Sequence, residues 1–337
     1  MVVLMKKLWL VVGCVWVVGM VAVMARGWFS SSSKAENPSA SSGLTRIGFS
    51  KVGAESDWRM ANTKSMKMTF SEKNGYELLV EEAQQKQSRQ VASIRNFIAR
   101  GVDYIVVAPV TEEGWDDVLR EVKEAKIPLI IVDRMIKSAS DDLYTCWVGS
   151  DFRKEGDVAV QWMEENLGRE RDLKIVHLQG TMGSSAQIGR TAGLQAGLER
   201  NPAWHVVVSD SGSFTHAKGK EIMEQMLRQH PYIDVLYSEN DNMTFGAMEA
   251  MDEAHRSYGL RGEITVISFD ATQAGLTATL QGKINYNVEC NPLHGPRVEE
   301  IIRRLQNGEQ PEKFSYVDEM SFDARHITQA DLDAREY

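Results

Sequence analysis

The chain has 337 residues, of which 43% are hydrophobic and 25% charged, and this is the composition of an ordinary globular protein. Its length favours two domains of roughly 100–200 residues each. The formal net charge of −9 argues against a nucleic-acid partner, because binding to phosphates needs a basic stripe on the surface.

The N-terminus contains a predicted targeting segment. Two lysines precede an uncharged run over residues 8–25, and Arg26 ends it. The run is long enough for a secretory signal and marginal for a membrane-spanning helix. Three fates of residues 1–29 stay open: cleavage after Ala25, retention as a membrane anchor, or lipid attachment at Cys14. Each of them places the rest of the chain outside the cytoplasmic membrane.

Residues 30–43 are rich in serine and are predicted to form a flexible linker. Only Cys146 and Cys290 follow this linker. Two cysteines do not make a disulfide framework, so buried free thiols are the simpler interpretation.

Apolar runs typical of β-strands alternate with amphipathic stretches along the remaining chain. Such uninterrupted apolar strands, separated by helices, indicate parallel sheets that are covered on both faces, which defines the α/β class. About ten strands are too many for one small sheet, so two successive sheets are expected. The predicted strands are TRIGFS (45–50), YELLVEEA (76–83), YIVVAPV (104–110), PLIIVD (128–133), YTCWVGSD (144–151), KIVHLQG (174–180), HVVVSD (205–210), DVLYSEN (234–240), ITVISFD (264–270) and INYNVEC (284–290).

Polar and aromatic side chains follow several of these strands. In open parallel sheets a ligand binds beyond the carboxyl ends of the strands, so these side chains are candidates for a site. An Asp or Asn in such a place can instead cap the next helix. Capping does not call for arginine, however, and Arg59 and Arg190 fall near helix starts, where a cation opposes the helix dipole. The candidates are Ser50, Glu55, Trp58, Arg59, Pro109, Asp133, Arg134, Ser150, Asp151, Gln179, Arg190, Asp210, Phe214, Asn240, Asp241, Asp270 and Glu289.

The chemistry of these candidates favours an uncharged polyol such as a sugar. Carboxylates accept hydrogen bonds from hydroxyl groups, guanidinium groups donate them, and an amide does both. An aromatic ring such as Trp58 can stack on the apolar face of a sugar ring. The acids outnumber the arginines, which argues against an anionic ligand.

Motifs for catalysis, cofactors and metals are missing from the sequence. Residues 213–221 (SFTHAKGKE) lack the glycine and the hydroxyl residue of a phosphate loop, and GTMGSS (180–185) is no dinucleotide fingerprint. No HExxH, paired CxxC or calcium loop occurs, and His177 lies inside a strand, as a core histidine would. Paired carboxylates could cleave glycosides, but arginines in the same pocket would keep an acid ionised and unable to donate a proton. We therefore predict a protein that is not an enzyme and has no cofactor.

The chain resembles the sugar-binding subunits of bacterial ABC importers with the ribose-binding type of fold, and most closely the galactofuranose-binding proteins. The resemblance spans about residues 45–314 and is carried by IGFSKVGAESDWR, QQKQSRQ, GVDYIVVAPV, IPLIIVDR, HLQGT, GSFTHAKGKE and the NDNM and SFDA turns. It implies that a monosaccharide binds in a cleft between two lobes. The ligand contacts that it implies are Glu55, Trp58, Arg59, Gln84, Asp133, Arg134, Arg190, Phe214, Asn240, Asp270 and Glu289.

The resemblance also implies the architecture and the partners. Two doubly wound parallel-sheet domains would be joined by a three-strand hinge, as in type I periplasmic binding proteins. The first lobe would comprise residues 44–148 and 290–316, and the second residues 149–289 and 317–330. A monomeric, extracytoplasmic protein would deliver the sugar to an ABC permease or, in the alternative, signal to a membrane histidine kinase. A lactose-repressor-type regulator would instead need a DNA-binding head at the N-terminus.

Four positions depart from the family pattern. Asp57 and Ala271 stand where glycine is usual, and Glu239 and Asn242 change the turn around Asn240. These departures bear on which sugar is bound. The implied fold would also place Cys146 and Cys290 beside the hinge, where we hypothesise that they could pair.

Overall fold

The computed structural model describes residues 43–337, which form one compact unit. Its first lobe is built on a six-stranded sheet with the strand order β11-β5-β4-β3-β1-β2, in which every pairing is parallel. The elements of this lobe are β1 (Thr45–Lys51), α1 (Asp57–Thr69), η1 (Glu72–Asn74), β2 (Tyr76–Glu82), α2 (Gln87–Arg100), β3 (Tyr104–Val107), α3 (Asp116–Glu124), β4 (Leu129–Val132), η2 (Asp141–Leu143), β5 (Cys146–Gly149), α9 (His294–Gln306) and β11 (Phe314–Tyr316).

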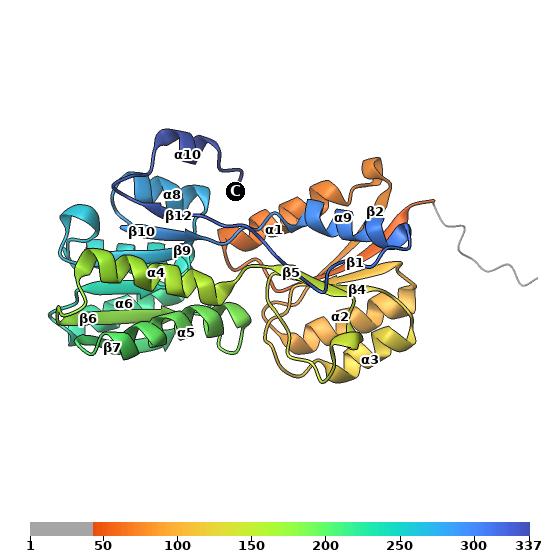
Figure 1. Cartoon of the computed structure of the whole chain (residues 1–337), viewed down its shortest axis with the longest axis horizontal. Helices are drawn as coiled ribbons and strands as arrows, with labels where there is room; N and C mark the ends of the chain where they lie inside the picture. Colours follow the sequence, from red (N-terminus) through yellow and green to blue (C-terminus); the bar gives the residue numbers. More distant parts are fainter. Residues whose placement is uncertain (1–42) are drawn as a thin grey trace, which may run out of the picture. The chain divides into compact units, whose positions relative to one another are not determined.

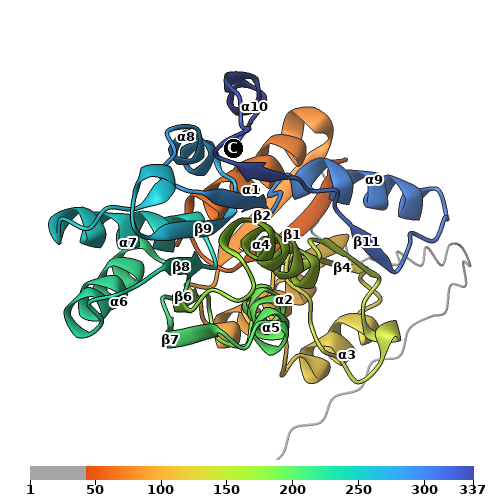
Figure 2. The same ribbon diagram turned by 60° about the vertical axis from the view of Figure 1, so that its left-hand side comes forward.

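The second lobe repeats this plan. Its six-stranded sheet has the order β12-β10-β9-β8-β6-β7, and only β12 runs antiparallel to its neighbour. Helices α4 and α5 lie side by side, as do α6 and α7 (Figure 2). The elements are α4 (Phe152–Leu167), β6 (Leu173–Gln179), α5 (Ser185–Arg200), β7 (Trp204–Ser211), α6 (His216–Gln229), β8 (Val235–Ser238), α7 (Asp241–Glu253), η3 (Gly259–Arg261), β9 (Thr265–Asp270), α8 (Gln273–Leu280), β10 (Tyr286–Glu289), β12 (Ser321–Asp323) and α10 (Gln329–Asp333).

Each sheet buries both of its faces. In the first lobe, Phe49 packs with α1 and α9 on one face, while Ile105 packs with α2 and α3 on the other. In the second lobe, Leu236 faces the α6–α7 side and Tyr237 faces the α4–α5 side. Alternate residues of a strand point to opposite faces, so a strand covered on both faces must be apolar throughout. The α/β class with two doubly wound parallel sheets is confirmed, and the antiparallel β12 is the exception.

The chain passes between the two sheets three times (Figure 1). It leaves the first sheet after β5, returns after β10, and leaves it again between β11 and β12. The predicted hinge of three crossings is therefore present. The lobe boundaries at residues 148/149, 289/290 and 316/317 stay a prediction.

The predicted targeting segment and most of the linker, residues 1–42, lie outside the described residues. Among residues 43–337, none of the helices combines the length and the apolar character needed to cross a membrane.

Candidate functional site

A cavity lies between the carboxyl ends of the two sheets. About 290 Å³ of space, part of it open to solvent, lies among its lining residues. Nine of the predicted contacts line it: Glu55, Trp58, Arg59, Asp133, Arg134, Arg190, Phe214, Asn240 and Asp270.

On the first lobe, Arg59 is held by two carboxylates. Its Nη1 lies 2.5 Å from Asp133 Oδ2, and its Nε donates to Glu55 Oε1 at 3.2 Å. Burial would lower the pKa of Arg59, but the two carboxylates outweigh burial and raise it. Burial would likewise raise the pKa of Asp133, but the nearby Arg59 and Arg134 lower it. Both partners are therefore held in their charged forms.

Arg134 lacks such a close partner. Its Nη1 donates to the Val110 carbonyl oxygen at 3.0 Å, and the nearest Asp133 oxygen is 3.9 Å from its Nε. This Nε is buried and has no hydrogen-bond acceptor among the described residues, and Glu55 Oε2 is buried and has no donor. Burial and the neighbouring Arg59 lower the pKa of Arg134 to about 10.

On the second lobe, Arg190 binds a carboxylate that lies outside the cavity lining. Its Nε donates to Glu155 Oε2 at 2.6 Å and its Nη1 donates to the Glu239 carbonyl oxygen, whereas Asp270 Oδ1 is 3.6 Å from its Nη2. Burial would lower the pKa of Arg190, but Glu155 raises it, so the guanidinium remains charged. Burial raises the pKa of Asp270 to about 8, because Arg190 offsets the desolvation of this carboxyl only in part.

Three cavity residues have backbone conformations that L-amino acids rarely adopt. Asp133, Phe214 and Asp270 have φ values of 63°, 62° and 100°. Such strain costs of order 1–3 kcal/mol per residue and persists where the surrounding structure imposes it, often at binding sites. Gly180 makes room for Phe214, since a Cβ at that position would lie 1.9 Å from the ring.

Asn240 is both a helix cap and a cavity residue, the two roles considered for polar residues at strand ends. Its Oδ1 caps α7 by accepting from the Met243 amide at 3.0 Å, and its Nδ2 lies 3.3 Å from the Phe214 carbonyl oxygen. Asp241, by contrast, is not a cavity residue, because Ser268, Thr272 and Asn287 donate hydrogen bonds to it inside the core of the second lobe.

Two contacts implied by the resemblance lie outside the cavity. Gln84 is exposed in the turn after β2, and its Oε1 accepts a hydrogen bond from Arg89. The Glu289 carboxylate binds Arg335 and the Tyr337 hydroxyl near the end of the chain, with both distances at 2.6 Å. Without Asp241 and Glu289, the cavity is lined by three acids and three arginines, so the expected excess of acids is wrong.

Sequence reasoning missed Ser56, Phe152, Ala186 and Cys290, which also line the cavity. Ser56 caps α1, and Phe152 lies under the Arg190 guanidinium, 5.5 Å from its carbon to the ring centroid. Small or apolar side chains after a strand carry no recognisable signal for polar recognition. Packing against an arginine is visible only in three dimensions.

Trp58 links the two lobes. Its Nε1 donates to the Cys290 carbonyl oxygen at 2.6 Å, and its ring joins the core cluster of the second lobe although α1 belongs to the first. The Arg59 guanidinium lies over this ring, with 4.5 Å between its carbon and the ring centroid.

The hypothesis that Cys146 and Cys290 pair is wrong in this structure. Both cysteines are buried and free. Cys146 packs in the core of the first lobe, whereas Cys290 packs with the core cluster of the second. His177 is confirmed as a core residue, because its two ring nitrogens lie 2.9 Å from Glu239 Oε1 and Ser209 Oγ.

Two doubly wound lobes with a polar cavity at their facing strand ends define a two-lobed ligand-binding protein. Comparison with known proteins agrees, because residues 47–293 match the periplasmic binding protein domain family. The chain belongs to this family.

Relatives of the chain have names that mention furanose sugars. The chain is 35% identical to the galactofuranose-binding protein YtfQ of Escherichia coli over 85% of this chain and 90% of the relative. A Mycobacterium smegmatis structure in complex with β-D-fucofuranose is 38% identical, with a TM-score of 0.80 over 86% of this chain and 97% of that one. A Shewanella protein of an arabinose ABC transporter, bound to α- and β-L-arabinofuranose, is 36% identical, with a TM-score of 0.81 over 87% and 96%.

Proposed function

We propose that this protein captures a monosaccharide in its furanose form in the cavity between the lobes. It then delivers the sugar to an ABC importer from the outer side of the cytoplasmic membrane, where the N-terminal segment directs or anchors it, and it performs no catalysis. The family membership and the furanose ligands of the relatives support this function.

One observation carries the choice of a sugar. A buried donor without a partner, Arg134 Nε, and a buried acceptor without a partner, Glu55 Oε2, line the same cavity. Leaving such groups unpaired costs about 1–3 kcal/mol each. A hydroxyl group accepts one hydrogen bond and donates another, so a polyol can satisfy both groups. A charged ligand would upset the balance of three acids and three arginines.

Entry of the sugar requires the lobes to separate. Arg134, Arg190 and Asp133 are only 1–2% exposed in this arrangement. Contacts across the cleft, such as the Met135 amide to Ser185 Oγ at 2.8 Å, hold the lobes together. We therefore interpret the structure as the closed form of a hinge-bending protein.

The sugar class is tested by calorimetric titration. We expect methyl furanosides of galactose, fucose or arabinose to bind with micromolar dissociation constants, which correspond to about −8.2 kcal/mol. The corresponding methyl pyranosides, whose ring form is fixed, should bind far more weakly. Equal affinity for both ring forms would refute the furanose preference, and the absence of binding by every sugar would refute the function.

The site itself is tested by Arg134→Met, which keeps the length of the side chain and removes its donors. We expect the affinity for the sugar to fall about 10–100-fold, because hydrogen bonds to charged groups contribute about 1.5–3 kcal/mol. The thermal stability of the sugar-free protein should not fall, since a buried charge without a close partner is removed. Gln84→Ala, at an exposed position outside the cavity, is the control and should bind normally. Normal binding by Arg134→Met would refute the site.

A further inference from the structure

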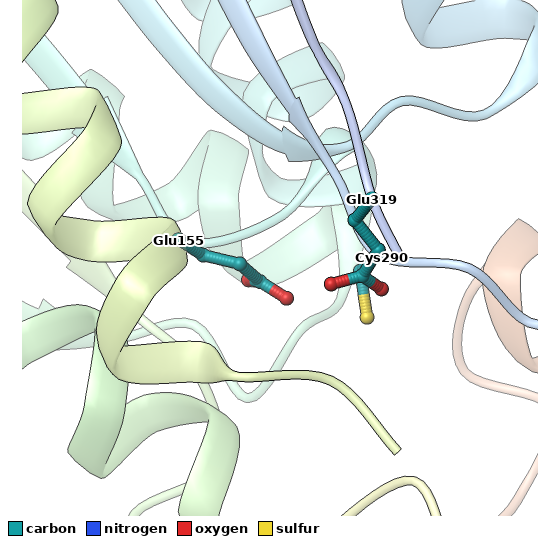
Figure 3. Close-up of side chains that lie close together, drawn as sticks. All are labelled: Glu155, Cys290 and Glu319. Carbon is teal, nitrogen blue, oxygen red and sulfur yellow. The ribbon is translucent and has the colours of Figure 1, made fainter. Parts of the chain in front are cut away.

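Four side chains converge where the chain crosses between the lobes. Ser150 follows β5, Cys290 follows β10, and Glu319 lies between β11 and β12, while Glu155 lies in the first turn of α4. The sulfur of Cys290 and carboxylate oxygens of the two glutamates all lie within 4.8 Å of one another. Figure 3 shows the Glu155 carboxylate directed toward the other two side chains.

Glu155 leaves one oxygen of this cluster without a partner. Glu155 is only 3% exposed. Its Oε2 accepts a hydrogen bond from Arg190 Nε, but its buried Oε1 has no hydrogen-bond donor among the described residues. A buried carboxylate oxygen that faces a thiol and a second carboxylate is unfavourable unless one of the acids holds a proton or a cation lies between them.

Ser150 and a backbone amide hold Glu319 in place. The Ser150 hydroxyl donates to Glu319 Oε1 at 2.6 Å and lies 3.3 Å from Cys290 Sγ, and the Asn291 amide donates to the same Oε1 at 2.7 Å. Both of these hydrogen bonds use Oε1. The second oxygen of Glu319 is therefore not needed for them.

We infer that Glu155, Cys290 and Glu319 form a binding site for a borderline-soft divalent cation, of which Zn²⁺ is the best match. Zinc binds thiolate at ~2.3 Å and carboxylate at ~2.0–2.2 Å in tetrahedral geometry, so its ligand atoms lie roughly 3.5 Å apart. The three ligand atoms lie within 4.8 Å of one another, so the cluster would contract to hold the metal. Magnesium and calcium fit less well, because they prefer oxygen ligands.

Binding would proceed by exchange of a proton for the metal. The Cys290 thiol releases its proton to solvent, and the thiolate, Glu155 Oε1 and a Glu319 oxygen each give a lone pair to the cation. Water or the Ser150 hydroxyl supplies the fourth ligand. Arg190 remains bonded to Glu155 Oε2 and orients the carboxylate, as hydrogen-bond partners of metal ligands commonly do.

The two glutamates also line a hollow that is separate from the sugar cavity. Asp151, Asp318 and Lys154 line this hollow with them. Cys290 lines the sugar cavity instead. The metal would therefore join α4 of the second lobe to two of the three crossings.

The test is a titration of the full-length protein with Co²⁺, a spectroscopic substitute for zinc. Because Cys14 lies outside the described residues, every protein carries Cys14→Ser. We expect a thiolate-to-cobalt charge-transfer band that Zn²⁺ displaces. Cys290→Ser should lose the band, and Cys146→Ser, which removes the other buried thiol, should keep it.

A misfolded Cys290→Ser protein would also lose the band, so a second variant tests the site independently. Glu319→Gln should keep the band but weaken Co²⁺ binding at least about tenfold. No band in the parent protein, a band that survives in Cys290→Ser, or unchanged affinity in Glu319→Gln would each overturn the site. None of these readouts requires sugar, so they stand apart from the proposed function.

Discussion

The two sides of the cavity handle buried charge differently. On the first lobe, Arg59 and Asp133 neutralise each other at 2.5 Å, and the pKa of Asp133 is lowered. On the second lobe, Arg190 donates a hydrogen bond to Glu155, and burial raises the pKa of Asp270 to about 8. On the first side, the Arg59–Asp133 ion pair is thus formed without a ligand, and we call this side organised. On the second side, the nearest guanidinium nitrogen of Arg190 is 3.6 Å from Asp270, and burial disfavours the charged form of this carboxyl.

The largest effect should come from removing the ion pair of the organised side. In Asp133→Ala, the buried Arg59 loses its closest carboxylate, and we expect the free energy of unfolding to fall by about 3–5 kcal/mol. Sugar binding should also be lost. Urea unfolding of the sugar-free protein measures the first effect. A fall of less than ~1 kcal/mol would mean that the side is not organised by this ion pair.

The organised side should also be sensitive to acid through His294. This residue begins α9 behind Trp58, with the ring centroids 5.9 Å apart, and its Nδ1 lies 2.9 Å from Asn62 Nδ2. Burial lowers its pKa from 6.5 to about 4. The unfolded chain therefore takes up a proton below pH 6.5 that the folded chain refuses, and the stabilisation, which is complete above that pH, is lost as the pH falls toward 4.

We expect this histidine to account for up to about 3 kcal/mol of the acid destabilisation, at about 1.4 kcal/mol per pKa unit. His294→Asn is the matched variant, because an amide oxygen can take the place of Nδ1 as an acceptor. Comparing urea unfolding at several pH values should show a shallower pH dependence in the variant. Parallel curves for both proteins would contradict the assignment.

A substitution on the second-lobe side should lower sugar affinity without lowering the stability of the sugar-free protein. Asp270→Asn keeps the shape of the side chain, and it replaces a carboxyl whose charged form burial already disfavours, so the sugar-free protein should be as stable as before. Sugar affinity should fall by about 1–3 kcal/mol, the cost of leaving a buried sugar hydroxyl without its acceptor. Thermal unfolding and calorimetry measure the two effects. A stability loss like that of Asp133→Ala would erase the difference between the sides.

The same contrast explains what the sequence could predict. Apolar strands and the polar residues after them give the fold class and most of the cavity, because the carboxyl ends of parallel strands meet at one edge. The sequence could not show that Glu289 binds Arg335 near the end of the chain. It could not show that Arg190 binds Glu155, a helix residue that no strand-end pattern marks. Which acid each arginine pairs with depends on distances that only the folded chain defines.

The smallest expected effect concerns contacts at the rim of the cleft, where two departures from the family pattern meet. The Asp57 amide donates to Asn242 Oδ1 at 3.1 Å, and Asn242 Nδ2 donates to Asp57 Oδ2 at 3.3 Å. One residue begins α1 of the first lobe and the other lies in α7 of the second, so these bonds exist only when the cleft is closed. Partly exposed hydrogen bonds of this kind contribute about 0.5–1.5 kcal/mol.

Asn242→Ala should therefore weaken sugar binding by about two- to tenfold, mainly through faster dissociation, because the closed form is stabilised after the sugar enters. Asp57→Ala should have a smaller effect, since its backbone amide remains. In a double-mutant cycle the two changes should be less than additive, as expected for residues in direct contact. Full additivity would show that the two residues act separately. The pair would then have no part in holding the two lobes together.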